Sequence, residues 1–235
     1  MTILIKGVLY KLFSNLKHFI VTSSNEQFCK YLSKHGVRIG EGVIFRYPHH
    51  ATIDTSRPGL ISIGKNVDIN DNFTIMTHDF VTFVFRNLYH DFVPSSGNVT
   101  IGNNIYIGRD VTILKGVTIG DNCIIGLGSI VTKDIPANSV VCGVPAKVVC
   151  SIDEYYTKRK KKSTKESIEY YKTLSKFLGR TPVPADFTEE WALFFREEDF
   201  DEYPEMHSVI DWRLKEYQAE FWKNISLYLM VLMIS

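Results

Sequence analysis

The sequence has few cysteines, almost no net charge and no long uninterrupted apolar run. Its four cysteines among 235 residues form no CxxC pair and show no His/Cys metal spacing, so a disulfide framework is not expected. This scarcity favours a reducing, cytoplasmic location. The formal net charge of +1 excludes a general electrostatic attraction to nucleic acid, so no nucleic-acid partner is expected. Any anion-binding site must therefore be local.

The apolar stretches at the two ends of the chain do not have the pattern of membrane spans. In residues 1–21 lysines interrupt the apolar residues, and neither a basic leading region nor a cleavage site is present. We therefore expect an amphipathic helix and no signal peptide. The run at 225–234 is far shorter than the ~20 residues that cross a bilayer. We expect both segments to pack on the protein, and peripheral membrane contact of the first is the less favoured alternative.

The main feature of the sequence is an internal repeat of six residues. Its aliphatic positions are Ile101, Ile107, Ile113, Ile119, Ile125 and Val131, and Ala137 continues the step. Weaker copies begin near Ile39 and Ile63. Three such units close one triangular coil, and stacked coils bury a column of Ile and Val. The strict step of six disfavours a β-sandwich, whose strands have period two between turns of variable length.

Glycine follows several of the aliphatic positions directly. We interpret these glycines as corners of the coil that need permissive backbone angles. They are Gly102, Gly108, Gly120 and Gly126.

The repeat fails between Ile75 and Ile101, which are 26 residues apart and so not separated by a multiple of six. The intervening segment is rich in aromatic residues, histidine and aspartate. Loops longer than ~12–15 residues in a compact domain are usually functional or disordered, and the aromatic content of this one argues against disorder. We therefore expect an excursion from the coil at residues 76–100, and expect the chemistry there.

Helical patterns flank the repeat on both sides. A short helix is predicted at 25–35, with Ser23 or Ser24 as its cap and Gly36 as its stop. After Cys150, helices are predicted at 154–176, which includes the basic run 158–162, at 188–196 and at 205–223. The predicted fold is mainly β, with an N-terminal helical segment (1–36), a β-helix domain (37–150) and a C-terminal helical extension (151–235).

Two stretches of the sequence resemble a known family. The runs IGNNIYIGRDVTILKGVTIGDNCIIGLGSIVTKDIP and VVCGVPAKVV are similar to the left-handed parallel β-helix acyltransferases, in particular the galactoside, maltose and xenobiotic acetyltransferases and the O-acetyltransferases of capsule and O-antigen synthesis. The resemblance covers about residues 37–149. It implies a left-handed coil, against the usual right-handed preference. It also implies a homotrimer with active sites between neighbouring chains, acetyl-CoA as co-substrate and a saccharide acceptor.

The resemblance places the catalytic histidine at His78, within TIMTHDF. An alcohol is a poor nucleophile at neutral pH, and a neutral imidazole is suited to take its proton during attack on the thioester. No covalent acyl-enzyme is needed, and His90 is the fallback base. A carboxylate should orient the ring through its other nitrogen, and the candidates are Asp79, Asp91 and Asp68. Asp79, the neighbour of His78, is assigned with it as catalytic.

The resemblance also indicates binding residues. The positions that correspond to CoA contacts in the family are Tyr106, Gly108, Gly126, Thr132, Lys133 and Lys147. Several relatives have Trp in place of Tyr106, and many have a smaller residue in place of Leu127. For the two lysines, solvated surface charge is the alternative. Acceptor binding is assigned to Asp68, Asn70, His90 and Asp91, and the excursion's aromatic rings are expected to stack on the sugar or to pack between chains.

Several alternatives stay open at this point. The same fold also serves N-acetyltransferases of nucleotide-linked amino sugars, and a non-catalytic β-helix scaffold would leave the CoA-type segment unexplained. A γ-class carbonic anhydrase needs three zinc histidines, for which His49, His50, His78 and His90 offer no suitable triplet, so no metal is expected. The basic run 158–162 fits CoA phosphate, an anionic polysaccharide, a nucleotide-sugar phosphate or a lipid surface, and a solvated helix face equally well.

Overall fold

The computed structural model describes residues 20–187, 202–203, 205–218 and 220–221. The chain divides into two compact units, Met1–Tyr156 and Thr157–Ser235. Most of the predicted helix at 1–21, the predicted helix at 188–196, the end of the one at 205–223 and the apolar run at 225–234 lie outside the described residues.

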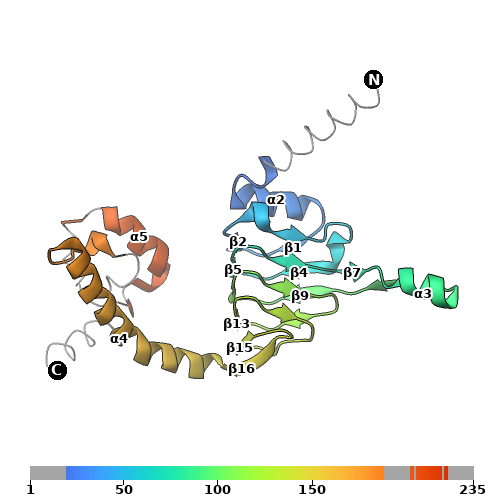
Figure 1. The fold of residues 1–235 in the computed structure, drawn as a ribbon. Helices are drawn as coiled ribbons and strands as arrows, with labels where there is room; N and C mark the ends of the chain where they lie inside the picture. Colours follow the sequence, from blue (N-terminus) through green and yellow to red (C-terminus); the bar gives the residue numbers. More distant parts are fainter. Residues whose placement is uncertain (1–19, 188–201, 204, 219, 222–235) are drawn as a thin grey trace, which may run out of the picture. The chain divides into compact units, whose positions relative to one another are not determined.

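The first unit is a coil of short parallel strands that visits three sheets in turn (Figure 1). Sheet A contains β1 (Arg38–Ile39), β4 (Ile61–Ile63), β9 (Val99–Ile101) and β12 (Thr118–Ile119). Sheet B contains β2 (Ile44–Phe45), β5 (Val67–Ile69), β10 (Ile105–Ile107), β13 (Cys123–Ile125) and β15 (Ser139–Cys142). Sheet C contains β3 (Thr52–Ile53), β6 (Thr74–Ile75), β11 (Thr112–Ile113) and β14 (Ile130–Val131). One strand from each sheet makes one turn, which confirms the predicted parallel β architecture.

The core of the coil is the aliphatic column that the repeat predicts. In sheet B, Ile107 pairs in register with Ile69 on one side and Ile125 on the other. In sheet C, Ile113 lies in the same way between Ile75 and Val131. These side chains are fully buried. Burial of each such side chain stabilises the fold by about 1.5–3 kcal/mol, so the stacked column is the main source of stability.

Asparagines hold the corner between sheets A and B. Four of them adopt the left-handed conformation, with φ between 53° and 59°: Asn66, Asn104, Asn122 and Asn138. The amide of Asn104 donates to Asn122 at 2.8 Å, and that of Asn122 donates to Asn138 at 2.9 Å. Asparagine tolerates positive φ better than other side chains, and here its side chain also links successive turns.

The glycines of the repeat have a different role from the predicted one. Gly102 and Gly120 do not have positive φ. A Cβ on Gly102 would lie 2.9 Å from the carbonyl carbon of Gly120 in the next turn, and one on Gly120 would lie 2.5 Å from the nitrogen of Ala137. Glycine is required here because stacked turns approach too closely for a side chain.

Both ends of the coil are covered. Helix α2 (Asn25–Lys34) packs Phe28 and Leu32 into the core of the first turn. Its N-cap Ser24 accepts a hydrogen bond from the Gln27 nitrogen at 3.2 Å, and Gly36 beyond its end has φ 102°, as predicted. At the other end, β16 (Lys147–Ser151) pairs antiparallel with β15. Two 3₁₀ turns, η1 (Pro48–His50) and η2 (Pro58–Leu60), lie in the early turns.

The excursion leaves the coil after β6 and returns at β9. Its base is a two-stranded antiparallel hairpin of β7 (His78–Asp79) and β8 (Ser95–Ser96). Between these strands, α3 (Thr82–Tyr89) projects away from the coil (Figure 1). Its surroundings expose many apolar side chains: Phe80, Phe83, Val84, Leu88, Tyr89 and Phe92.

Helix α4 (Ile152–Leu178) begins in the first unit and ends in the second. It is followed by the 3₁₀ turn η3 (Pro184–Asp186), helix α5 (Glu205–Leu214) and the 3₁₀ turn η6 (Lys215–Tyr217). Within the second unit, Phe187 is buried against the rings of Tyr170 and Tyr171. Arg180 pairs with both oxygens of Asp186, at 2.7 and 2.8 Å. No helix among the described residues is both long and apolar enough to cross a membrane.

Candidate active site

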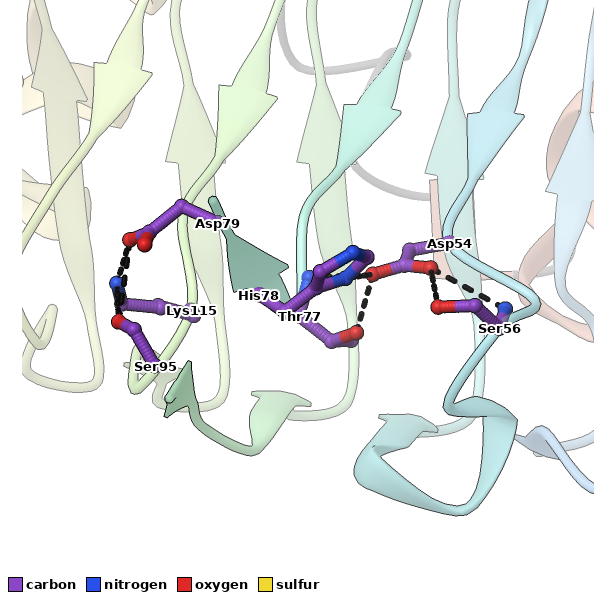
Figure 2. Close-up of polar contacts among 7 residues, drawn as sticks. All are labelled: Asp54, Ser56, Thr77, His78, Asp79, Ser95 and Lys115. Carbon is purple, nitrogen blue, oxygen red and sulfur yellow. Dashed lines mark hydrogen bonds and ion pairs between the residues drawn. The ribbon is translucent and has the colours of Figure 1, made fainter. Parts of the chain in front are cut away.

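His78 lies at the base of the excursion, beside a carboxylate from the preceding turn. β3 and β6 pair in parallel, with Ile53 opposite Ile75, so Asp54 directly after β3 lies next to the chain that leaves β6. The Nδ1 atom of His78 lies 2.6 Å from Oδ2 of Asp54, and their side chains are only 13% and 8% exposed. Figure 2 shows the ring directed at this carboxylate. The sheet pairing therefore builds a shielded His–Asp pair.

Asp54 is held by further donors on both of its oxygens. Oδ2 accepts from the nitrogen of Thr77 at 3.1 Å and from the Thr77 hydroxyl, and Oδ1 accepts from the Ser56 hydroxyl at 2.6 Å. Burial acts to raise the pKa of Asp54, but the hydrogen bonds from Ser56, Thr77 and His78 outweigh it and hold the pKa well below its usual range. An ionised carboxylate only accepts, so Nδ1 carries a proton, and in the neutral ring the lone pair is then on Nε2.

The carboxylate beside His78 is thus not one of the three that the sequence suggested. Asp79 contacts Lys115 and Ser95 instead (Figure 2). Successive side chains of a strand point to opposite sides, so the neighbour of His78 on β7 faces away from it. Asp68 pairs with Arg46, and Asp91 accepts from the nitrogen of Phe92 at 2.7 Å. The prediction that one of these three orients the histidine is wrong.

Lys115 is a second residue that the sequence analysis missed. Its Nζ contacts both the Asp79 carboxylate on β7 and the Ser95 hydroxyl on β8 (Figure 2). Gly97, just after β8, lies so close to Gly116 that a Cβ would approach the Gly116 nitrogen to 2.7 Å. Both strands of the hairpin are therefore fixed to the corner that follows β11. This anchor holds the hairpin whose first residue is His78.

Three of the predicted binding residues gather on sheet B. Tyr106 and Asp68 are register partners on β10 and β5, so their side chains share the outer face. The Asn70 amide donates to the Tyr106 hydroxyl at 3.4 Å. Gly108 and Gly126 lie in the same column as Asn70, each at the point where the chain turns out of sheet B. A Cβ on Gly126 would lie 2.9 Å from that of Cys142, so these turns are tightly stacked.

The remaining predicted residues lie apart from His78. Thr132, Lys133 and Lys147 are exposed after β14 and on β16, and His90 and Asp91 are exposed beyond α3. Among the described residues, no hydrogen bond or ion pair joins any of these five to His78.

The comparisons with known proteins agree with this architecture. Residues 98–133 match the family described as bacterial transferase hexapeptide, six repeats. Protein CapG of Staphylococcus aureus is 39% identical over 127 residues, which cover 54% of this chain and 73% of CapG. The chain belongs to the hexapeptide-repeat family of bacterial transferases. The predicted family is confirmed.

Other relatives of this hexapeptide-repeat transferase are matched over a smaller share of their length. Galactoside O-acetyltransferase of Escherichia coli K12 is 46% identical over 102 residues, 42% of this chain and 49% of that protein. The putative acetyltransferase YvoF of Bacillus subtilis 168 is 34% identical over 108 residues, 46% of this chain and 58% of that protein. The chain thus spans about half the length of these two relatives.

Solved structures also match. A maltose O-acetyltransferase from Clostridium difficile 630 has a TM-score of 0.42 and 27% identity, over 63% of this chain and 88% of that one. A galactoside acetyltransferase in complex with coenzyme A has a TM-score of 0.38 and 30% identity, over 60% of this chain and 80% of that one.

The hexapeptide-repeat transferase contains one further polar cluster that the sequence did not indicate. Asp71 is buried and accepts from His50 Nδ1 at 2.6 Å and from Arg109 Nη2 at 2.8 Å. The hydrogen bond from His50 is the main reason that the pKa of Asp71 is lowered, and the charge of Arg109 adds to it. The described residues include no group of three or more His, Cys, Asp or Glu that could hold a metal ion.

Chemically, the His78–Asp54 pair is suited to general base catalysis. The ring is fixed through Nδ1, its Nε2 can accept a proton, and the charge that then forms lies next to an ionised carboxylate. In a shielded site this electrostatic support is stronger than in water. The arrangement therefore fits reactions in which a hydroxyl or amine must lose a proton as it attacks.

Proposed function

We propose that the chain transfers an acetyl group from acetyl-CoA to a sugar hydroxyl, with His78 as the general base. The observation that carries this proposal is the contact of His78 Nδ1 with the ionised Asp54, which leaves Nε2 free to accept a proton. A sequence relative named galactoside O-acetyltransferase supports the reaction type.

In the proposed reaction, Nε2 of His78 takes the proton of the acceptor hydroxyl while its oxygen forms a bond to the thioester carbon. The carbonyl oxygen becomes negative, and the C–S bond then breaks to give the acetyl ester. The imidazolium returns the proton to the CoA sulfur, so no covalent enzyme intermediate forms. Asp54 stays ionised throughout and stabilises the imidazolium. General base catalysis of this kind contributes typically ~10²- to 10⁴-fold.

The binding of CoA is assigned to Tyr106, Gly108, Gly126, Thr132, Lys133 and Lys147. The tightly stacked glycines leave the corner after sheet B without side chains at two successive turns, which suits a narrow pantetheine arm. The exposed ammonium groups of Lys133 and Lys147 are suited to phosphate.

The acceptor is assigned to Asp68, Asn70, His90 and Asp91. Arg46 contacts Asp68 through two nitrogens, and Asn70 contacts Tyr106, so the first two residues are held in place on sheet B. His90 and Asp91 are exposed on the excursion. Asp79 is assigned a positioning role through Lys115.

A homotrimer with a left-handed coil completes the proposal. Tyr106 lies on β10 of sheet B and Asn70 directly after β5, whereas His78 comes three residues after β6 of sheet C, and in the proposed trimer neighbouring coils combine these residues in one site. The exposed apolar residues around α3 fit burial between chains. Apart from the excursion, the described turns between sheets are short and contain no α-helix, so the packing that favours right-handed crossovers does not operate. The proposal includes a cytoplasmic role in capsule or other surface polysaccharide synthesis, which the sequence resemblance implies.

The test is CoA-thiol release with a panel of galactosides, oligosaccharides and nucleotide-linked amino sugars, with the product identified by mass spectrometry. His78→Gln should reduce release at least ~100-fold on a hydroxyl acceptor. His35→Gln is the matched control, because His35 is exposed and its ring contacts the carbonyl and the ring of Tyr31, which has no role in the proposed site. Transfer to an amine with only a modest loss in His78→Gln would instead favour the N-acetyltransferase. Absence of release on every acceptor would contradict both.

A further inference from the structure

Helix α4 carries a concentration of positive charge that the proposed reaction does not use. The helix holds eight lysines and arginines against four carboxylates, a net charge of +4, whereas the whole chain has +1. The rest of the chain therefore carries −3. Six of the eight cations lie within residues 158–165, here called the basic segment: Lys158, Arg159, Lys160, Lys161, Lys162 and Lys165. Charge is thus segregated onto one short stretch of helix.

The basic segment is open to solvent in the described structure. All six cations are exposed, and the first buried residue of the helix, Ser167, comes after the segment. Arg159 pairs with Glu166 at 2.8 Å, and the helix as a whole has four more cations than carboxylates. Lys158 and Lys162, and likewise Lys161 and Lys165, stand at i and i+4, where like charges repel. An anionic partner would relieve this repulsion.

The distribution of the cations around the helix distinguishes between partners. At 3.6 residues per turn, the five consecutive cations point to all sides of the helix axis. A flat membrane surface contacts only one side, whereas a flexible polymer with repeated anionic groups can reach several. Residues 157–165 include no apolar side chain, so the segment has no apolar face to insert into a bilayer. A soluble polyanion is favoured.

We propose that the basic segment binds an anionic polysaccharide, and that this polymer contains the acceptor sugar. The proposal rests on the acetyl transfer proposed above. Carboxylate or phosphate groups repeated along the polymer pair with the lysines, and the contacts are individually weak and salt-sensitive. The segment begins seven residues after the end of β16, so a polymer bound there is kept at raised local concentration for transfer by the coil.

The experiment measures binding of the full chain to polygalacturonate, to a glycerol-phosphate polymer and to neutral dextran. Lys158, Lys160, Lys161 and Lys162 are changed together to glutamine, which keeps good helix propensity. The matched control changes four exposed lysines outside the basic segment to glutamine, which removes the same total charge: Lys30, Lys34, Lys172 and Lys176. Circular dichroism checks that both variants keep their helices.

At least one of the two anionic polymers should bind, with affinity that falls as salt rises, and dextran should not. The basic-segment variant should lose at least tenfold in affinity and the control less than twofold. The proposal is overturned if neither anionic polymer binds, if both variants weaken binding equally, or if phosphatidylserine vesicles or single-stranded RNA bind more tightly than the polymers.

A parallel assay separates this proposal from the proposed function. CoA-thiol release with a small neutral galactoside should be the same in both variants as in the unmodified chain, while the KM for an anionic oligosaccharide acceptor rises at least tenfold only in the basic-segment variant. Equal KM values would overturn the acceptor proposal. Absence of thiol release from the unmodified chain on every acceptor would contradict the acetyl transfer, whatever the polymer binds.

Discussion

In the coil, the side chains of Ile69, Ile107 and Ile125 stack directly on one another and are fully buried, whereas no side chain from His78 to Ser96 is buried. The coil repeats one packing arrangement turn after turn. The excursion breaks it, and its base holds two polar groups: the His78–Asp54 pair, and Lys115 with Asp79 (Figure 2). We expect the buried column to carry most of the stability and the proposed chemistry to lie at the base of the excursion, and substitutions in the two regions should separate them.

The largest expected effect is on the stability of the coil. Ile113→Ala removes a fully buried side chain between Ile75 and Val131, and should lower the free energy of unfolding by about 2–5 kcal/mol. Denaturant titration measures the loss. At a temperature where the variant is folded, its rate of thiol release should stay within about twofold of the parent, because Ile113 touches none of the proposed reacting groups. A large loss of rate in the folded variant would show that the two regions are not separable.

Asp54→Asn should act mainly on the rate of the reaction, whereas Ile113→Ala acts mainly on stability. The amide keeps the size of the carboxylate but cannot stabilise the imidazolium, so kcat should fall about 10- to 100-fold while CoA affinity is unchanged. Steady-state kinetics and calorimetric titration with CoA measure the two quantities. Asp110→Asn is the control, since Asp110 is exposed and contacts Asn72 and not His78. If Asp110→Asn lowered kcat as much as Asp54→Asn, the assignment of the orienting carboxylate would be wrong.

Lys115→Met should have a smaller effect, of about five- to tenfold on kcat/KM. The methionine keeps the length of the side chain but removes the contacts with Asp79 and Ser95 that hold the hairpin of β7 and β8. Lys115→Arg should recover most of the activity, because it restores a cation at the anchor. Hydrogen exchange of residues 78–96 should accelerate in the methionine variant alone. Unchanged exchange together with reduced activity would contradict a positioning role.

The smallest effect concerns acid stability. The pKa of Asp54 lies below its unfolded value of ~3.9, so its contribution is fully present above about pH 5 and is lost as the pH falls towards the folded-state pKa. Between about pH 5 and pH 3 the loss should be on the order of 1 kcal/mol. Urea titrations over this range should show a shallower decline in Asp54→Asn than in the parent. A parallel decline in both proteins would mean that Asp54 does not carry this dependence.

The division between the regular coil and the excursion also determines what could be predicted from the sequence. The coil was predictable because its signal is local: each turn repeats after 18 residues, as between Asn104 and Asn122. Asp54 was missed because the turn that contains it is longer, with Ile53 paired to Ile75, 22 residues on. Lys115 was missed because it lies at a corner of the regular repeat, while the residues that it contacts lie in the excursion. The glycines were found, but the close approach of stacked turns, not φ, requires them.

The most direct test of the account is a double-mutant cycle on His78 and Asp54, with CoA-thiol release in the presence of acceptor as the readout. If Asp54 acts only through the histidine, adding Asp54→Asn to His78→Ala should change the residual rate by less than about twofold, although Asp54→Asn alone lowers it at least tenfold. If Asp54→Asn lowers the rate of His78→Ala by the same factor as it lowers that of the parent, the two residues act independently and the proposed base is wrong.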